Sequence, residues 1–461
     1  MLWYNKAMEK EQARCVHFIG IGGIGMSALA RFYHSKGWRI SGSDLQSSEI
    51  TEELAKEGMQ IAIGRHKAAN VPKEATLVIR TAATPLTNVE VKRAITRGIP
   101  VRLYAEELGV LTRQYRTVTI SGSHGKSTTT ALTALVMQEG SLDPTVILGT
   151  KLKEFGNSNF RRGKGSYFVL EADEYNRSFL HFSPQIAIVT NIDAEHLDTY
   201  KTVEGVEQAF KQYLEKIPKD GVIIANHDDE RLRRVAGRFN NNVVWYSLES
   251  PEADTVRAII QIPGDHNVSN ALAALMLGRT LGIPEHAILS VIGRYRGAWR
   301  RFEFKGMING GYIYNDYGHH PSEIRATLAA ARATFPFRRV LCVFQPHQYA
   351  RLAYNWDGFI QAFDGADRVI LLPVYEVAGR DAKKAKHTVN SEKLAHELIL
   401  RGKNAAHLTF EEAPKEIPPM LRQGDVVLMM GAGNIYDLTN EMVSQKESAL
   451  SRPLPRLSHR K

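Results

Sequence analysis

Short runs of apolar residues alternate along most of the chain with longer stretches in which apolar residues recur every three or four positions. The first run, residues 15–19, is followed by a glycine turn and by a stretch that places Met26, Leu29, Phe32 and Tyr33 on one helical face. A buried strand gives the short run and an amphipathic helix gives the longer period, so the pattern predicts repeated strand–helix units. Such units build a mostly parallel sheet covered by helices on both faces, which is an α/β fold.

The expected strands fall into three series. They are expected at residues 15–19, 39–42, 76–82 and 99–103, then 117–121, 167–170, 186–189 and 222–225, then 312–314, 340–344, 369–372 and 426–430, with helices over 88–97 and 268–281. At roughly 100–200 residues per domain, 461 residues suit three domains. We expect boundaries near residues 110 and 298, which gives domains over 1–110, 111–298 and 299–448 and a basic, disordered tail over 449–461.

Composition narrows the class of protein. Hydrophobic residues make up 43% and charged residues 23% of the chain, a globular balance, and no stretch reaches the ~18–20 apolar residues of a membrane span. The first 14 residues lack the apolar core of a signal peptide. Cys15 and Cys342 are too far apart for a disulfide framework or a zinc motif. We therefore expect a reduced, cytoplasmic protein without membrane insertion.

The formal net charge of +10 changes this picture little. Four of the basic residues lie in the last ten positions, and no nucleic-acid-binding motif accompanies them. A solvated surface with a basic tail explains the charge best, a preference for anionic small molecules comes second, and we expect no nucleic-acid partner.

A first glycine-rich turn joins the first expected strand to the first helix. Its glycines are Gly20, Gly22, Gly23 and Gly25. Glycines there allow close backbone approach, and the helix N-terminus offers free N–H donors for a phosphate. Asp44 ends the next expected strand, where an acid that binds a ribose would lie. An NAD-dependent oxidoreductase, another diphosphate site and simple tight packing all remain open on this motif alone.

A second glycine loop follows the expected strand 117–121 and opens a helix. It consists of Gly122, Ser123, His124, Gly125, Lys126, Ser127 and Thr128. Backbone N–H groups of such a loop cradle phosphates, the lysine adds positive charge, and the serine hydroxyl suits Mg²⁺. The two glycines are three positions apart, where the common P-loop has five. The loop nevertheless indicates ATP binding, and a capping turn is the competing interpretation.

Acidic residues follow the next two strands of the same series. Glu171-Ala-Asp-Glu174 ends one strand, and Thr190-Asn-Ile-Asp-Ala-Glu-His196 ends the other. The carboxyl ends of parallel strands are where open α/β sheets bind ligands. Oxygen-rich clusters suit Mg²⁺, and His196 could add a nitrogen ligand.

Together these motifs resemble the Mur ligases. Further matching runs are His-Asn-Val-Ser-Asn-Ala-Leu-Ala at 266–273, Arg-Arg-Phe-Glu at 300–303, Asp-Tyr-Gly-His-His-Pro at 316–321 and Phe-Gln-Pro-His-x-Tyr-x-Arg at 344–351. Their order and spacing match over about residues 15–440. The resemblance implies a Rossmann-like N-terminal domain for a UDP-sugar, a central P-loop ATPase domain with a mostly parallel sheet, and a C-terminal Rossmann-like α/β domain that closes over the site.

The resemblance also implies a reaction, in which L-alanine is joined to the lactyl carboxylate of UDP-N-acetylmuramate through an acyl phosphate, with ATP and Mg²⁺. Its implied site residues fall into four groups. Lys126 and Arg301 act on the transferring phosphoryl group, and Ser127, Glu171 and His196 hold Mg²⁺. Asn267 and Asn270 contact the adenine, and Asp316 contacts the ATP ribose. His347 and Arg351 place the substrate carboxylate or the alanine, and the first glycine loop, Asp44 and His66 bind the UDP-sugar.

Some positions depart from the family pattern. Ser127 replaces the usual threonine, Gln348 stands where many relatives have arginine, and Glu174-Tyr-Asn differs from the commonest run. Sibling ligases use a carbamylated lysine, but Lys211 is better explained as an exposed position on a helix. Two competing functions stay open: a ligase that attaches a recycled murein tripeptide, and a nucleotide-binding module without catalysis. We expect a monomer or a weak homodimer.

Overall fold

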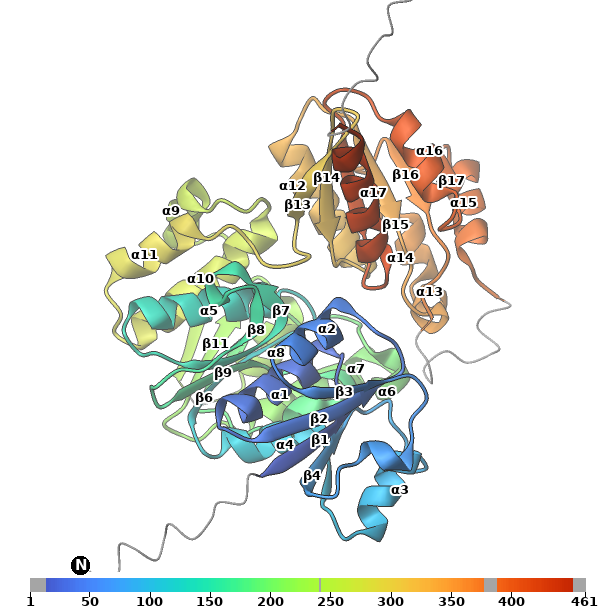
Figure 1. Ribbon diagram of the computed structural model, residues 1–461. Coiled ribbons are helices and arrows are strands. Elements are labelled where there is room, and N and C mark those ends of the chain that lie inside the picture. Colours follow the sequence, from blue (N-terminus) through green and yellow to red (C-terminus); the bar gives the residue numbers. More distant parts are fainter. Residues whose placement is uncertain (1–13, 240–241, 377–387, 451–461) are drawn as a thin grey trace, which may run out of the picture. The chain divides into compact units, whose positions relative to one another are not determined.

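The computed structural model describes residues 14–239, 242–376 and 388–450, and these form two compact units (Figure 1). The first unit contains the chain up to Gln261 together with Asn267–Ala298. The second contains Ile262–His266 and the residues from Trp299 onward. Residues 451–461, most of the segment for which we expect a disordered tail, lie outside the described residues.

The first sheet of the first unit has five parallel strands in the order β3-β2-β1-β4-β5. Its central strand β1 is buried at all five positions, as expected from a run that is apolar except for His17. The strands are β1 Cys15–Ile19, β2 Arg39–Asp44, β3 Gln60–Ile63, β4 Ala75–Arg80 and β5 Val101–Leu103; the helices are α1 Ile24–Ser35, α2 Glu49–Lys56, α3 Val89–Thr96 and α4 Tyr104–Thr112, with the short η1 Ala68–Asn70.

The second sheet of this unit has seven strands in the order β12-β11-β10-β6-β9-β7-β8, and only the β7–β8 pair is antiparallel. The strands are β6 Arg116–Ser121, β7 Thr145–Leu152, β8 Ser158–Arg161, β9 Tyr167–Glu171, β10 Ile186–Val189, β11 Val222–Asn226 and β12 Asn242–Tyr246. The helices are α5 Lys126–Glu139, α6 Leu197–Tyr200, α7 Val203–Leu214, α8 Glu230–Ala236, α9 Pro251–Ile259, α10 Asp265–Thr280 and α11 Glu285–Arg294, with the short η2 Lys153–Phe155 and η3 Tyr175–His181.

Helix α1 joins the two sheets of the first unit, because it contacts β7 and β8 of the second sheet as well as β1 and β2 of its own. Buried polar contacts reinforce this joint. Arg31 donates to Asn159 Oδ1 (2.6 Å) and to Glu57 (2.6 Å). Lys151, with a side chain only 4% exposed, pairs with Glu49 (2.8 Å) and Glu53 (2.6 Å).

This joint gives a stability prediction. Replacing Lys151 with methionine is expected to lower the free energy of unfolding of the first unit by about 1–3 kcal/mol, since the two glutamates lose their shared cation. The loss stays below that of a fully buried pair because Glu49 and Glu53 are 53% and 30% exposed and can rehydrate. Urea unfolding followed by tryptophan fluorescence measures it. Lys153→Met, at an exposed position nearby, is the matched control, and an equal loss in both variants would contradict the prediction.

The second unit carries a six-stranded sheet in the order β13-β14-β18-β15-β16-β17, parallel except for the β13–β14 hairpin. The strands are β13 Glu303–Ile308, β14 Gly311–Asp316, β15 Val340–Phe344, β16 Arg368–Leu371, β17 Ala405–His407 and β18 Val426–Met430; the helices are α12 Pro321–Thr334, α13 Tyr349–Tyr354, α14 Trp356–Ile360, α15 Ser391–Leu400, α16 Ala413–Met420 and α17 Ile435–Leu450. In the part of the chain that the structure describes, no helix combines the length and apolar character needed to cross a bilayer.

Candidate active site

The second glycine loop lies at the centre of the seven-stranded sheet. Strand β6, which leads into the loop, is paired with β10 on one side and β9 on the other. Gly122 (φ 130°) and Gly125 (φ 83°) adopt backbone conformations that favour glycine. A Cβ atom would lie 2.1 Å from Thr190 Oγ1 at Gly122 and 2.3 Å from Asn270 Oδ1 at Gly125. The loop therefore requires both glycines, for conformation and for space.

The loop is held by the segment that follows β10. The Ser123 N–H donates to the Asn191 carbonyl (3.2 Å), and Ser123 Oγ accepts from the Asp193 N–H (2.8 Å). The His124 N–H donates to Asn191 Oδ1 (2.9 Å), while its ring Nε2 lies 3.1 Å from Asp193 Oδ2. These contacts fix the backbone of the loop against the segment that follows β10.

Lys126 lies at the N-terminus of α5 and pairs with an acid from the end of β9. Its Nζ is 2.9 Å from Glu174 Oε2 and donates to the Gly122 carbonyl (2.6 Å). Burial disfavours the charged lysine, but the carboxylates of Glu174 and Asp173 outweigh this and raise the pKa of Lys126 above its ordinary value. Lys126 is therefore a permanent positive charge at the loop.

One carboxylate oxygen of Glu174 indicates where a cation could bind in the cluster. The side chain is fully buried, and Oε1 has no hydrogen-bond partner among the described residues. His196 Nε2 is 3.8 Å from that oxygen, and the His196 ring contacts Tyr175 with centroids 4.9 Å apart. A buried carboxylate oxygen without a donor suits a cation.

A second part of the cluster lies next to α5. Ser127 Oγ donates to Glu171 Oε2 (3.2 Å), and Glu171 Oε1 accepts from the Gly149 N–H (2.6 Å). Side-chain ligand atoms of Asp173, Glu174 and His196 lie within 4.8 Å of one another. This donor set of mainly oxygen atoms fits a hard divalent cation such as Mg²⁺.

The structure shows contacts of the expected cation ligands within two pairs. Ser127 lies with Glu171, whereas His196 lies with Glu174, an acid that our sequence assignment left out of the site together with Asp173. The signal for both was present, since they belong to the same run at the end of β9. Lys211 is 40% exposed and pairs with Glu215 (3.9 Å).

The two asparagines assigned to adenine lie in α10, against the phosphate loop and α5. Asn270 Oδ1 accepts from Thr129 Oγ1 (3.1 Å), and its Nδ2 is 3.4 Å from Asn267 Oδ1. Both side chains are largely buried. Sequence residues more than 130 positions apart are therefore neighbours here, as a nucleotide site requires.

The first glycine loop lies against the end of β2. The N–H groups of Gly20 and Ile21 donate to the Ser43 carbonyl (2.8 and 3.1 Å), and the Gly22 N–H donates to Asp44 Oδ2 (2.8 Å). His66 Nδ1 is 3.2 Å from Ser43 Oγ. The structure therefore brings the loop, Asp44 and His66 together at the N-terminus of α1.

In the second unit, two arginines surround one tyrosine ring. The guanidinium carbons of Arg300 and Arg301 lie 5.0 and 5.1 Å from the ring centre of Tyr317. Arg300 is buried and donates to the carbonyls of Gly431 (2.6 Å) and Gly433 (2.9 Å). It anchors the backbone next to Arg301.

Asp316 holds the same turn from the end of β14. Its Oδ2 accepts from the Phe302 N–H (2.9 Å), and Oδ1 accepts from the Gly318 N–H (2.8 Å) and Thr327 Oγ1 (3.2 Å). Asp316 therefore organises the loop around Arg301, and its contact with an ATP ribose stays a prediction.

His347 and Arg351 lie together after β15. Arg351 Nη1 is 3.1 Å from His347 Nδ1, and the His347 ring stacks on Tyr375 with centroids 5.4 Å apart. Gln348 has a positive φ of 69°, and its N–H donates to the Tyr375 carbonyl (2.9 Å). The two residues that sequence analysis grouped are thus neighbours.

Comparison with known proteins adds the family. Three family models match in order: "Mur ligase family, catalytic domain" over residues 15–116, "Mur ligase middle domain" over 120–261, and "Mur ligase, glutamate ligase domain" over 300–433. A protein of Alkaliphilus metalliredigens (strain QYMF) named UDP-N-acetylmuramate–L-alanine ligase is 38% identical over 464 residues, which cover 95% of this chain and 99% of the relative. The chain belongs to the Mur ligase family.

Solved structures agree with this Mur ligase assignment. The UDP-N-acetylmuramate–alanine ligase of Thermotoga maritima matches with a TM-score of 0.79 and 28% identity, over 94% of this chain and 99% of that one. A murein peptide ligase from Psychrobacter arcticus 273-4 shares the fold, with a TM-score of 0.72 at 20% identity over 96% and 100%. The predicted family and the predicted α/β fold are confirmed.

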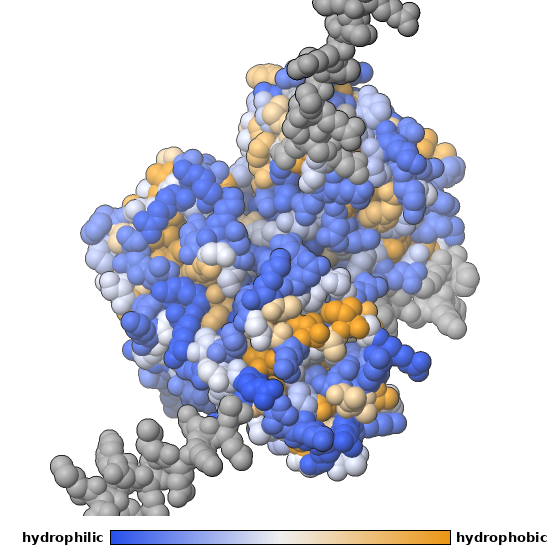
Figure 2. Space-filling model, in the orientation of Figure 1, coloured by the Kyte–Doolittle hydropathy of each residue, from blue (hydrophilic) through white to orange (hydrophobic). Residues whose placement is uncertain are grey.

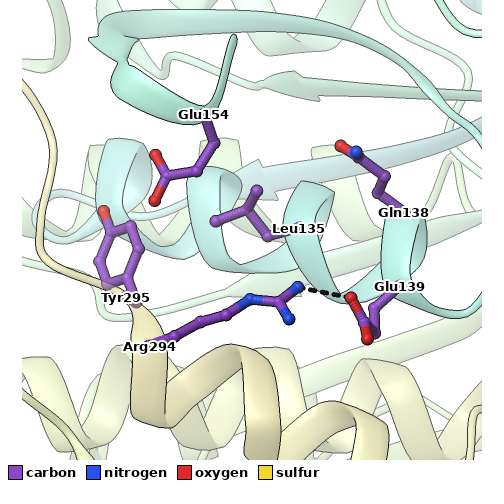
Figure 3. Close-up of a pocket in the computed structure, with 6 residues that line it drawn as sticks. All are labelled: Leu135, Gln138, Glu139, Glu154, Arg294 and Tyr295. Atoms are coloured by element: carbon purple, nitrogen blue, oxygen red, sulfur yellow. Dashed lines mark hydrogen bonds and ion pairs between the residues drawn. The ribbon is translucent and has the colours of Figure 1, made fainter.

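A cavity of this Mur ligase lies beside the C-terminal half of α5, whereas Lys126 is at the N-terminus of that helix (Figure 3). Its volume is about 200 Å³, and Leu135, Gln138, Glu139, Glu154, Arg294 and Tyr295 line it. Arg294 is already paired with Glu139 (2.5 Å). Helix α5 is 14 residues long, which separates the cavity from Lys126 by about 15–20 Å, so the cavity is not part of the candidate site.

Proposed function

We propose that this protein is an ADP-forming ligase that joins L-alanine to the lactyl carboxylate of UDP-N-acetylmuramate in peptidoglycan precursor synthesis. The observation that carries the proposal is the clustering of Lys126, Ser127, Glu171, Glu174 and His196 at the adjoining ends of β6, β9 and β10. The near full-length similarity to a UDP-N-acetylmuramate–L-alanine ligase supports the choice of substrates. We further propose that it acts in the cytoplasm; Cys15 and Cys342 are free, buried thiols, which suits that compartment.

The chemistry proceeds in two steps. A carboxylate is a poor acyl donor, so its oxygen first attacks the γ-phosphate of ATP, giving an acyl phosphate and releasing ADP. The amine of L-alanine then attacks the acyl carbon, and inorganic phosphate leaves as the amide forms. Phosphoryl transfer depends mainly on positioning and on neutralising charge.

Positive charge at the phosphate is the contribution of Lys126 and Arg301. Lys126 stays protonated because its acidic neighbours raise its pKa, so its charge is present throughout the pH range of an assay. The N–H groups at the N-terminus of α5, from Gly125 to Thr128, bind the remaining phosphate oxygens. Arg301, held by the Asp316 and Arg300 contacts, supplies the second positive charge.

Ser127, Glu171 and His196 are the proposed Mg²⁺ ligands, with Asp173 and Glu174 as further oxygen donors. When bound, Mg²⁺ neutralises charge on the phosphate oxygens. Ser127 donates to Glu171 and Lys126 pairs with Glu174, and these contacts orient the side chains within the cluster.

The remaining residues hold the substrates. The N–H groups of Ile24 and Gly25 in the first turn of α1 receive the diphosphate of the UDP-sugar, beside the glycine turn that Asp44 holds and near His66. Leu45 (53% exposed) and Ile63 (48%) lie at the ends of β2 and β3, and they suit the face of a base. Figure 2 shows that apolar residues gather on part of the surface of the first unit. Asn267 and Asn270 contact the adenine of ATP and Asp316 its ribose, while His347 and Arg351 place the substrate carboxylate or alanine.

One assay tests the proposal: phosphate release from ATP, with Mg²⁺ and UDP-N-acetylmuramate, for L-alanine, glycine, L-serine and the murein tripeptide added separately. We expect turnover with L-alanine to exceed that with the tripeptide at least tenfold, and the product to contain one new amide. Equal phosphate release without any amino acid would contradict amide synthesis. Turnover with the tripeptide alone would show the tripeptide ligase activity instead. Sedimentation of the same sample checks the expected monomer or weak homodimer.

A further inference from the structure

A cluster of buried polar side chains lies directly beneath the first glycine loop. Its centre is Glu90, in the first turn of α3, whose side chain is fully buried. Oε2 is 3.0 Å from His17 Nε2 and accepts from Ser43 Oγ (2.6 Å). Oε1 accepts from Asn70 Nδ2 (2.6 Å) and is 3.2 Å from His66 Nδ1. Four side chains from β1, β2, η1 and the segment after β3 thus converge on one carboxylate.

This carboxylate is ionised. Burial disfavours the charged form, but hydrogen bonds from His17, Ser43 and Asn70 outweigh that cost and lower the pKa of Glu90 to about 2. An ionised carboxylate only accepts hydrogen bonds, so each neighbour has to present a hydrogen to it. Glu90 therefore determines where its neighbours carry their protons.

Two members of the cluster, Asn70 and His66, combine a contact to Glu90 with exposure to solvent. The His66 side chain is 18% exposed, whereas those of His17 and Glu90 are not exposed at all. Its Nδ1 faces Glu90 and Ser43. Among the described residues, Nε2 has no hydrogen-bond partner. A carboxylate at Nδ1 fixes the neutral ring with its proton on that nitrogen, which leaves Nε2 as an acceptor.

The same cluster is tied to the glycine loop through Ser43. The Ser43 carbonyl accepts from the N–H groups of Gly20 and Ile21, while its hydroxyl donates to Glu90. The carboxylate is therefore connected both to the loop proposed to bind the diphosphate and to the histidine beside it.

We propose that Glu90 is a positioning residue of the UDP-sugar site, which acts through His66: it holds the proton on Nδ1 so that Nε2 accepts a hydrogen bond from an N–H or hydroxyl donor of the uridine moiety. This inference rests on the proposed function, because it takes the UDP-sugar as the ligand. Glu90 itself is buried and does not touch the ligand.

The kinetic test is Glu90→Gln. Glutamine keeps the shape of the side chain, but it places an N–H donor at a position whose neighbours need a hydrogen-bond acceptor. We expect KM for UDP-N-acetylmuramate to rise about tenfold or more, with kcat and KM for ATP within twofold of the wild type. Glu107→Gln is the matched control, since Glu107 is buried and hydrogen-bonded in the same sheet domain, to Arg102 (2.6 Å), outside the glycine loop. A parallel rise of KM in the control, or an equal fall of kcat, would overturn the proposal.

Coupling to His66 separates positioning from a general structural role. If Glu90 acts through His66, then His66→Ala alone removes the contribution of Glu90 to binding of the UDP-sugar. Adding Glu90→Gln to that variant is then expected to raise KM for UDP-N-acetylmuramate by less than a further twofold. Fully additive effects would overturn the inference. Asn70→Ala removes one donor to Glu90 and serves as the milder variant if Glu90→Gln does not fold; its rise in KM is expected to vanish in the His66→Ala background too.

The tautomer can be read without any substrate, by ¹⁵N NMR of the histidine-labelled full chain at pH 8. We expect His66 to carry its proton on Nδ1 in the wild type and to shift toward the Nε2-protonated form in Glu90→Gln. A wild-type proton on Nε2 would overturn the proposal. A wild type that shows the expected tautomer but does not turn over UDP-N-acetylmuramate would instead contradict the proposed function.

Discussion

Replacing Lys126 with methionine is expected to lower kcat by about a thousandfold or more while the protein stays folded. The substitution removes the positive charge from the loop that receives the phosphates, in a buried setting where charge acts strongly. Methionine keeps the length of the side chain, so α5 and the glycine loop retain their packing. Phosphate release with saturating ATP, UDP-N-acetylmuramate and L-alanine measures the effect, and circular dichroism checks the fold.

The matched control for this variant is Lys403→Met. Lys403 also pairs with a carboxylate, Asp364 at 2.7 Å, but it lies after α15 in the second unit. We expect its kcat to stay within twofold of the wild type. If Lys126→Met kept more than a tenth of the wild-type kcat, the assignment of the phosphate loop would be wrong.

Glu174→Gln is expected to reduce kcat by about a hundredfold. The buried carboxylate is paired with Lys126, lies beside His196, and has one oxygen without a hydrogen-bond partner among the described residues, so its charge serves both the lysine and a bound cation. The amide keeps the shape and removes the charge. Asp425→Asn, which breaks a buried pair with Arg339 (2.5 Å) in the second unit, is the control, and its kcat is expected to change by less than threefold.

The pH dependence gives this variant a second readout. Burial lowers the pKa of Lys126, and the charge of Glu174 is the largest influence that raises it. Activity needs the protonated lysine and is lost as the pH rises through its pKa. In the wild type that pKa is raised, so kcat is expected to stay level up to pH 10; in Glu174→Gln the alkaline fall moves to lower pH. Identical alkaline limbs in both proteins would contradict the pairing.

The sequence was sufficient to predict the buried central strands of each sheet. Strands β1, β10, β15 and β18 have the bounds that their apolar runs predicted, because every position in them is buried. The edge strands β3, β8, β12, β13 and β17 were missed. Most of their positions are partly exposed, and only β12 contains an apolar run of four residues, from Val243 to Tyr246. Strand β7 was missed for another reason: Gly149 interrupts it, where a Cβ atom would lie 2.6 Å from Glu171 Oε2.

Sequence order also limits what can be inferred about the site. The strand series placed the phosphate loop, Glu171 and His196 at neighbouring strand ends, and the structure has them there. The sequence could not decide which of the three acids at the end of β9 faces the lysine, because this depends on the turn that follows Glu171. The sequence also showed no sign of the role of Glu90. Its partner His17 is 73 positions away, and only the folded sheet brings the two side chains together.

Helix α1 has a consequence for any attempt to dissect this protein. Arg31 of α1 is bonded to Asn159, and α2 supplies both carboxylates around Lys151. A fragment that ended near residue 110 would therefore leave these side chains without their partners and would expose the surface of α1 that packs on β7 and β8. The smallest portion suited to separate expression is therefore the whole first unit through Ala298. By the same reasoning, a chimera that exchanged the first sheet with that of a relative would have to exchange β7 and β8 along with it.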